Sequence, residues 1–192
     1  DLHSFPTRRS SDLVVISAGS SGGLYAQIAN GAPYDVFLSA NARYPRRLVA
    51  AGLAAGPSRF TYAQGVLVLW GAQPAPAAGP GTLRGATFAH LALANPHFAP
   101  YGQAAQEVLT RLGLLEQLHS RLVFGEDVGQ ALQFAISGGA QYAFVSSAQL
   151  LAAGLWQRGS HWVVPVSLYT PINQQAVLMV HARDVQIGRA HV

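Results

Sequence analysis

Residues 19–40 read GSSGGLYAQIANGAPYDVFLSA, and this stretch holds the features that decide the fold. A turn rich in Gly and Ser is followed by a run in which Leu24 and Ile28 stand four residues apart, as on one face of a helix. Gly31 marks the place where such a helix ends. The stretch therefore predicts a helix over Gly22–Asn30 and a short strand over Asp35–Ser39.

The same alternation continues along the chain. Further helices are expected at Pro45–Ala51, Gly102–Leu112, Leu114–Ser120, Gly129–Ser137 and Ala148–Ala153. Further strands are expected at Leu13–Ala18, Gly65–Trp70, Leu91–Ala94, Leu122–Phe124, Tyr142–Val145, Trp162–Val166 and Ala176–Val180. The predicted helices end at Gly113, Gly138 and Gly154. This order of elements predicts an α/β fold built on parallel strands with flanking helices.

Composition excludes several classes of protein. Half of the 192 residues are hydrophobic and 10% are charged, which excludes a disordered chain. The longest apolar runs, such as Val66–Trp70, are far shorter than the roughly 20 residues of a membrane-spanning helix. No cysteine is present, so disulfides, thiolate catalysis and cysteine-bound zinc are excluded. The basic residues are all Arg and are scattered, so we expect no nucleic-acid partner.

The two ends differ from the rest of the chain. Residues 1–13 and 187–192 fit no predicted element, and both resemble translated sequencing-adapter sequence. Residues 1–13 also lack the apolar run of a secretory signal. We therefore expect both segments to be non-native, and we expect the native stretch, 14–186, to be truncated at both ends.

Candidate binding residues lie in three loops that precede predicted helices. These loops are Ser17–Gly23, Asn95–Gly102 and Gly125–Gly129. The first turn of a helix has unpaired N–H groups and the positive end of the helix dipole, which favours anions. Such loops also begin with Ser, Gly or Pro merely to cap a helix, and that alternative stays open.

A serine hydrolase is a second alternative, because Gly19-x-Ser21-x-Gly23 matches the nucleophile turn of α/β-hydrolases. Its base would be His161 or His181, and its acid Asp127 or Glu126. The Glu126–Asp127 pair also fits a helix cap. The histidines show no metal-ligand spacing, so we expect no protein-bound metal ion and no cofactor.

The stretch 19–40 resembles a signature of the periplasmic molybdate-binding proteins of ABC transporters, above all in QIANGAPYDVFLSA. Further similar blocks are Ala94–Pro96, Ala99–Gly102, Gly125–Val128, Gln130–Leu132 and Pro171–Val177. The resemblance covers nearly all of 14–186. It implies a two-lobed type II periplasmic binding protein fold, with residues 14–69 and 172–186 in lobe 1 and residues 70–171 in lobe 2. The hinge would lie near Leu69–Gly71 and Pro171–Asn173.

The resemblance also implies the site and the function. Ser21, Tyr101 and the backbone amide of Val128 would bind molybdate or tungstate, with Ser20 and Ser146 as less certain ligands. The family's first anion-binding loop would precede Val14, and its closing helix is missing. Ser146 stands where some members have a tyrosine.

The resemblance implies a periplasmic binding protein that delivers the anion to an inner-membrane permease. Such a protein would be monomeric when complete, and it would not be an enzyme. A binding protein for another oxyanion, such as sulfate, remains an alternative.

Overall fold

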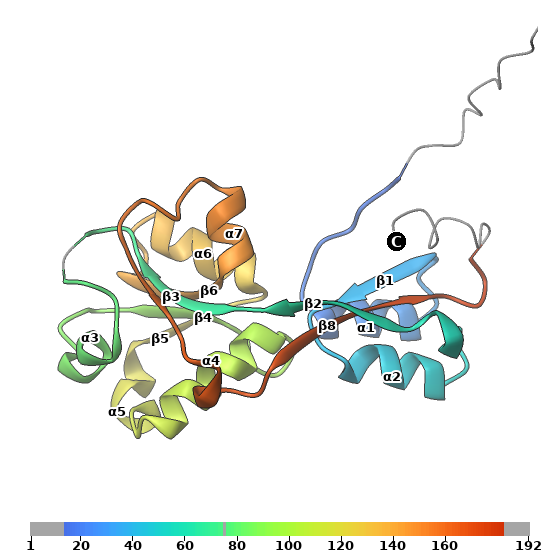
Figure 1. The fold of residues 1–192 in the computed structure, drawn as a ribbon, viewed down its shortest axis with the longest axis horizontal. Helices are drawn as coiled ribbons and strands as arrows, with labels where there is room; N and C mark the ends of the chain where they lie inside the picture. Colours follow the sequence, from blue (N-terminus) through green and yellow to red (C-terminus); the bar gives the residue numbers. More distant parts are fainter. Residues whose placement is uncertain (1–13, 75, 183–192) are drawn as a thin grey trace, which may run out of the picture.

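The computed structural model describes residues 14–74 and 76–182, which form two lobes joined by long strands (Figure 1). The segments expected to be non-native, 1–13 and 187–192, lie outside the described residues. None of the helices in the described part is both long and apolar enough to cross a bilayer.

The smaller lobe contains two helices that cover one face of a three-stranded sheet. Its elements are α1 (Ser21–Ala29), β1 (Val36–Ser39), α2 (Arg43–Ala50), the 3-10 helix η1 (Gly56–Ser58), β2 (Phe60–Gly65) and β8 (Ile172–Leu178). The strand order is β1-β8-β2, and both pairs are antiparallel. The central strand therefore comes from the far end of the sequence.

The two faces of this smaller sheet differ. Phe37 and Val177 are paired in register and pack with Ile28, Tyr44 and Leu48 of the two helices. One residue along β8, Ala176 is paired with Leu38 of β1 on one side and with Phe60 of β2 on the other. The side chains of Leu38 and Phe60 are 58% and 50% exposed. Since successive side chains of a strand point to opposite faces, one face of the sheet is core and the other is open in the described structure.

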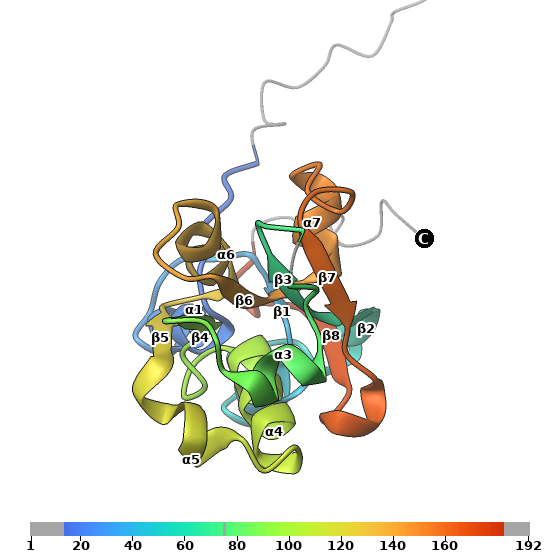
Figure 2. The same cartoon turned by 90° about the vertical axis from the view of Figure 1, so that its left-hand side faces the viewer.

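The larger lobe has helices on both faces of a five-stranded sheet (Figure 2). Its strands are β3 (Leu67–Gly71), β4 (Leu91–Ala94), β5 (Leu122–Gly125), β6 (Tyr142–Ser146) and β7 (Ser160–Val163). Its helices are α3 (Pro80–Gly85), α4 (Pro100–Arg111), α5 (Leu115–Leu118), α6 (Val128–Ile136) and α7 (Ser147–Ala152), with 3-10 turns η2 (His119–Arg121) and η3 (Val166–Leu168). The strand order is β5-β4-β6-β3-β7.

The predicted α/β class is confirmed, and its parallel pairs are β4 with β5 and β4 with β6. Strand β3 pairs antiparallel with β6 and β7. Its side chains alternate between two cores: Leu67 and Leu69 pack toward α4, whereas Val68 and Trp70 pack toward α6. Burial on both faces explains why β3 is an unbroken apolar run.

The first crossing between the lobes lies earlier than predicted. Strand β2 pairs in the smaller sheet and β3 in the larger sheet, with Val66 between them. The predicted hinge at Leu69–Gly71 therefore falls inside a paired strand, and residues 67–69 belong to the larger lobe. The chain returns through β8, which starts at Ile172.

Several predicted elements differ from the structure. Residues 14–18 form no strand, and Val14, Val15 and Ile16 are 71%, 81% and 83% exposed. A strand needs a hydrogen-bonding neighbour, and no described strand pairs with this segment. Helix α3 and most of β2 were not predicted, because neither shows a regular apolar pattern.

Candidate functional site

Four helices begin where the two lobes meet. Strands β5, β4 and β6 are neighbours with parallel pairing, so their carboxyl ends lie at one edge of the larger sheet. Each is followed by a helix, α6, α4 and α7 respectively, and α1 of the smaller lobe begins on the opposite side (Figure 1). This is the arrangement in which open α/β sheets bind ligands.

Ser20 and Ser21 start α1 and have different tasks. The Ser20 Oγ accepts a hydrogen bond from the Gly23 N–H at 3.2 Å, so it caps the helix. The Ser21 side chain is 6% exposed, and its Oγ accepts from the Ala40 N–H at 2.9 Å. A hydroxyl that accepts one bond still has its own proton to donate. Both hydroxyls keep a proton to donate, and Ser21 differs from Ser20 in that its bond to Ala40 joins α1 to the end of β1 and it does not cap the helix.

Tyr101 lies in the first turn of α4, after Pro100. Pro at this place removes an N–H that would otherwise be unpaired, and it presets the backbone for a helix. The backbone N–H of Tyr101 has no acceptor among the described residues. Its side chain is 6% exposed, and its hydroxyl accepts a hydrogen bond from the Gln174 Nε2 at 3.0 Å.

The Tyr101 hydroxyl stays protonated over the physiological range. Burial raises its pKa to about 12, because the phenolate would be poorly solvated there, while hydrogen bonds with Gln174 and Ser146 oppose the rise. The hydroxyl therefore keeps a proton to donate at neutral pH.

Val128 is the first residue of α6, and Asp127 caps this helix. One Asp127 carboxylate oxygen accepts from the Gln130 N–H at 2.9 Å, and the Gln130 side chain accepts from the Glu126 N–H at 2.7 Å. The Val128 N–H has no acceptor among the described residues. The predicted cap at Asp127 is confirmed. The backbone N–H of Val128 therefore remains available to a ligand, next to the Asp127 carboxylate.

Ser146 ends β6 and caps α7. Its Oγ accepts from the Gln149 N–H at 3.2 Å and donates to the Gln149 Oε1, also at 3.2 Å, in a capping box. The Ser146 side chain is buried. The Ser146 proton is used by the Gln149 side chain, so this hydroxyl serves as a helix cap.

Direct contacts connect these helix starts. The Gly22 N–H donates to the Phe98 carbonyl oxygen at 2.9 Å, which joins the first turn of α1 to the loop before α4. The Asn95 N–H donates to the Gly125 carbonyl oxygen at 2.7 Å, which joins that loop to the one before α6. The turns that carry the predicted site residues are thus brought together. Their role in binding stays a prediction.

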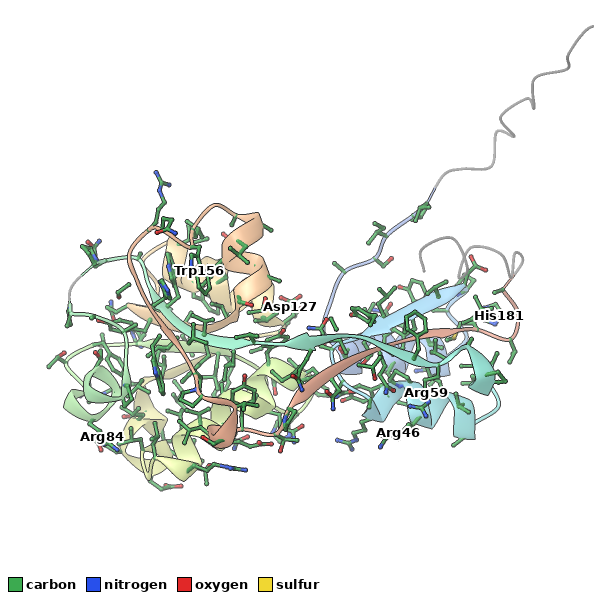
Figure 3. All side chains as sticks on the ribbon, in the orientation of Figure 1. Arg46, Arg59, Arg84, Asp127, Trp156 and His181 are labelled. Atoms are coloured by element: carbon green, nitrogen blue, oxygen red, sulfur yellow. The ribbon has the colours of Figure 1, made fainter. Side chains whose placement is uncertain are left out.

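The hydrolase triad is not assembled. The His161 ring packs against Trp156 with ring centroids 4.4 Å apart, and both lie in the larger lobe. His181 lies at the outer end of the smaller lobe, far from Asp127 in Figure 3. Neither histidine is a hydrogen-bond partner of Ser21, whose Oγ is bonded to the Ala40 N–H. The described part of the chain holds no cluster of three or more His, Asp or Glu that could bind a metal ion.

Sequence reasoning gave no individual role to three contributors to this region, Gly65, Phe98 and Gln174, although Phe98 and Gln174 lie in segments that it singled out. A Cβ atom on Gly65 would overlap the Tyr101 hydroxyl oxygen and lie 3.0 Å from the Gln174 Nε2. Phe98 contributes only its carbonyl oxygen to the contact with Gly22. These contacts depend on packing between segments far apart in sequence, so no local sequence pattern predicts them.

Comparisons with known proteins agree with this geometry. A family described as bacterial extracellular solute-binding proteins matches residues 2–192. The molybdate-binding protein ModA of Azotobacter vinelandii is 45% identical over 180 residues, which cover 93% of this chain and 71% of that protein. ModA of Rhodobacter capsulatus is 41% identical over 186 residues, which cover 97% and 73%. The solved structure of the Azotobacter vinelandii periplasmic molybdate-binding protein matches with a TM-score of 0.88 at 46% identity, covering 94% of this chain and 79% of that chain.

Proposed function

This chain belongs to the bacterial extracellular solute-binding proteins, and from that premise we propose that it binds molybdate between its two lobes for an ABC transporter. It is a binding protein and not an enzyme. The observation that carries the proposal is its 45% identity, over 93% of its length, to a molybdate-binding protein. The hydrolase alternative is not favoured, since Ser21 has no histidine partner within residues 14–74 and 76–182.

The donors at the helix starts support an oxyanion as the ligand. Ser21 and Tyr101 offer hydroxyl protons, and Tyr101 and Val128 offer backbone N–H groups without an acceptor among the described residues. The first turns of α1, α4 and α6 add the positive ends of three helix dipoles. Ser20 and Ser146 support these groups as helix caps. We propose Ser21, Tyr101 and Val128 as the residues that bind the anion.

A site made of donors favours an anion without a proton. Molybdate, tungstate and sulfate are such dianions at neutral pH, whereas phosphate keeps a proton that would need an acceptor. Leaving a polar group unpaired in a buried site costs about 1–3 kcal/mol. Tungstate is therefore a second proposed ligand, and sulfate would have to be rejected through the size of the site.

The proposed partner is the inner-membrane permease of an ABC transporter, and the proposed compartment is the periplasm. Both follow the family and the molybdate-binding relatives. We further propose, following the family resemblance, that the protein acts as a monomer. We propose no nucleic-acid partner, because the basic residues are all Arg and are scattered along the chain.

Calorimetry with molybdate, tungstate, sulfate and phosphate on one sample tests the proposal. Molybdate and tungstate should bind more tightly than sulfate, and phosphate should bind most weakly. Sulfate binding tighter than molybdate would contradict the assignment. Small-angle scattering of the same sample should show compaction on adding molybdate, because binding between lobes favours the closed form.

A further inference from the structure

The Tyr101 hydroxyl lies where both crossings between the lobes meet. Strand β2 ends at Gly65, which is paired in register with Ile172, the first residue of β8. Two residues further along β8, the Gln174 Nε2 donates to the Tyr101 hydroxyl at 3.0 Å. Because Gly65 has no side chain, the phenol packs directly against the crossing strand. A residue of a proposed anion-binding turn is thus held by both connecting strands.

The hydrogen bonds of the Tyr101 hydroxyl indicate whether it donates or accepts toward a ligand. A phenol has one proton to donate and can also accept. The Gln174 amide occupies its accepting side, so the phenol proton must point elsewhere. The Tyr101 proton is therefore left to donate to a ligand.

We propose that Gln174 is a positioning residue that keeps the Tyr101 hydroxyl a donor and so selects fully deprotonated oxyanions over oxyanions that retain a proton. The inference rests on the proposed function and adds a residue that sets its selectivity. Without the Gln174 amide, the Tyr101 oxygen is free to accept a hydrogen bond. A protonated oxyanion, such as hydrogen phosphate, could then donate its proton there instead of losing a hydrogen bond on burial.

The chain offers a matched control for this test. Gln174→Met removes the amide and keeps the length of the side chain. Gln64→Met makes the same change on β2, where the Gln64 Nε2 donates to the Asn173 Oδ1 at 3.2 Å on the exposed side of the crossing. Both variants remove one hydrogen bond between side chains at the crossing strands, but Gln174 is the one bonded to Tyr101.

The experiment measures affinity for molybdate and for inorganic phosphate at neutral pH by calorimetry. Gln174→Met should lower the ratio of molybdate to phosphate affinity by about tenfold, the factor expected for one hydrogen bond gained or lost. Gln64→Met should keep the parent ratio. In a Tyr101→Phe background, adding Gln174→Met should change nothing, because the hydroxyl it acts on is gone. Thermal melts of each variant establish that it is folded.

The inference is overturned if Gln174→Met keeps the parent ratio of molybdate to phosphate affinity, or if this variant shows no detectable phosphate binding. An equal fall in Gln64→Met, or a fall that persists in the Tyr101→Phe background, overturns it as well, since the effect would then be a general loosening of the crossing. Failure of the parent chain to bind molybdate would instead contradict the proposed function, so the two failures are distinguishable.

Discussion

The amide of Gly22 in the smaller lobe donates a 2.9 Å hydrogen bond to the carbonyl oxygen of Phe98 in the larger lobe. The approach is so close that a Cβ atom on Gly22 would lie 2.8 Å from that oxygen and 2.7 Å from the Tyr44 hydroxyl. Glycine is therefore required where α1 meets the loop before α4. This contact connects the Ser21 side of the proposed site to the Tyr101 side.

Gly22→Ala should weaken molybdate binding by holding the lobes apart. Overpacking of this kind costs about 1–3 kcal/mol, which corresponds to about 5- to 150-fold in affinity when the strained contact belongs to the bound form. Calorimetry measures the loss, and small-angle scattering should give a larger radius for the variant. Gly19→Ala is the matched control, because its Cβ would meet only the Leu24 side chain at 3.8 Å. Equal effects of the two substitutions would contradict the role given to this contact.

Ser21→Ala and Ser20→Ala should separate binding from helix capping. Loss of one hydroxyl bond to a dianion costs roughly 1.5–3 kcal/mol, so Ser21→Ala should lower affinity by about 10- to 150-fold. Ser20→Ala removes the cap on the Gly23 N–H and should cost about 1 kcal/mol of stability with a smaller effect on affinity. Calorimetry and denaturant unfolding measure the two quantities. An Ser21→Ala variant with parent affinity would place the anion elsewhere.

Raising the pH should destabilise the protein through Tyr101. The folded-state pKa of this phenol is raised to about 12 by burial, above the ordinary value of 10.0, so the folded state holds the proton more tightly than the unfolded state. Its contribution is complete below pH 10 and is lost as the pH rises toward 12. The loss is on the order of 2–3 kcal/mol. Denaturant unfolding between pH 9 and 12 measures the free energy of unfolding, which should fall less steeply with pH for Tyr101→Phe than for the parent. Identical slopes in the two proteins would refute this prediction.

The ends of the helices were predictable because they depend on local chemistry. Gly113 and Gly138 follow α4 and α6 with φ of +71° and +82°, a conformation that other residues rarely adopt. Asp127 was predicted as a cap from its place before α6, and it is one. Such features need only neighbouring residues, and a sequence displays them directly.

Contacts between distant segments were not predictable in this way. Strand β2 is mostly exposed and shows no alternation, so only its pairing with β8 makes it a strand. The pairing of Gly65 with Ile172 joins residues from opposite parts of the chain. The bond between Tyr101 and Gln174 spans 73 positions. The site residues came from helix starts and a resemblance, whereas their arrangement around the crossing required the fold.

Asp127 places a negative charge next to the proposed anion contact at the Val128 N–H, so removing that charge should tighten binding. Asp127→Asn keeps an oxygen that can accept from the Gln130 N–H, and Asn caps helices as well as Asp does. Two like unit charges about 4 Å apart repel by about 1 kcal/mol in a water-like dielectric, and we expect a gain of that order, about fivefold in affinity. The helix loses only the modest attraction of its N-terminus for a carboxylate.

Asp127→Ala provides the comparison, because it removes both the charge and the cap. It should gain the same affinity per folded molecule but lose about 1 kcal/mol of stability. The gain in both variants should shrink at high salt, since salt screens charges that are partly exposed. Calorimetry at low and high ionic strength, with unfolding curves for each variant, measures these effects. If Asp127→Asn binds molybdate no more tightly than the parent at low salt, the anion does not lie at the first turn of α6, and Val128 would have to be removed from the proposed site.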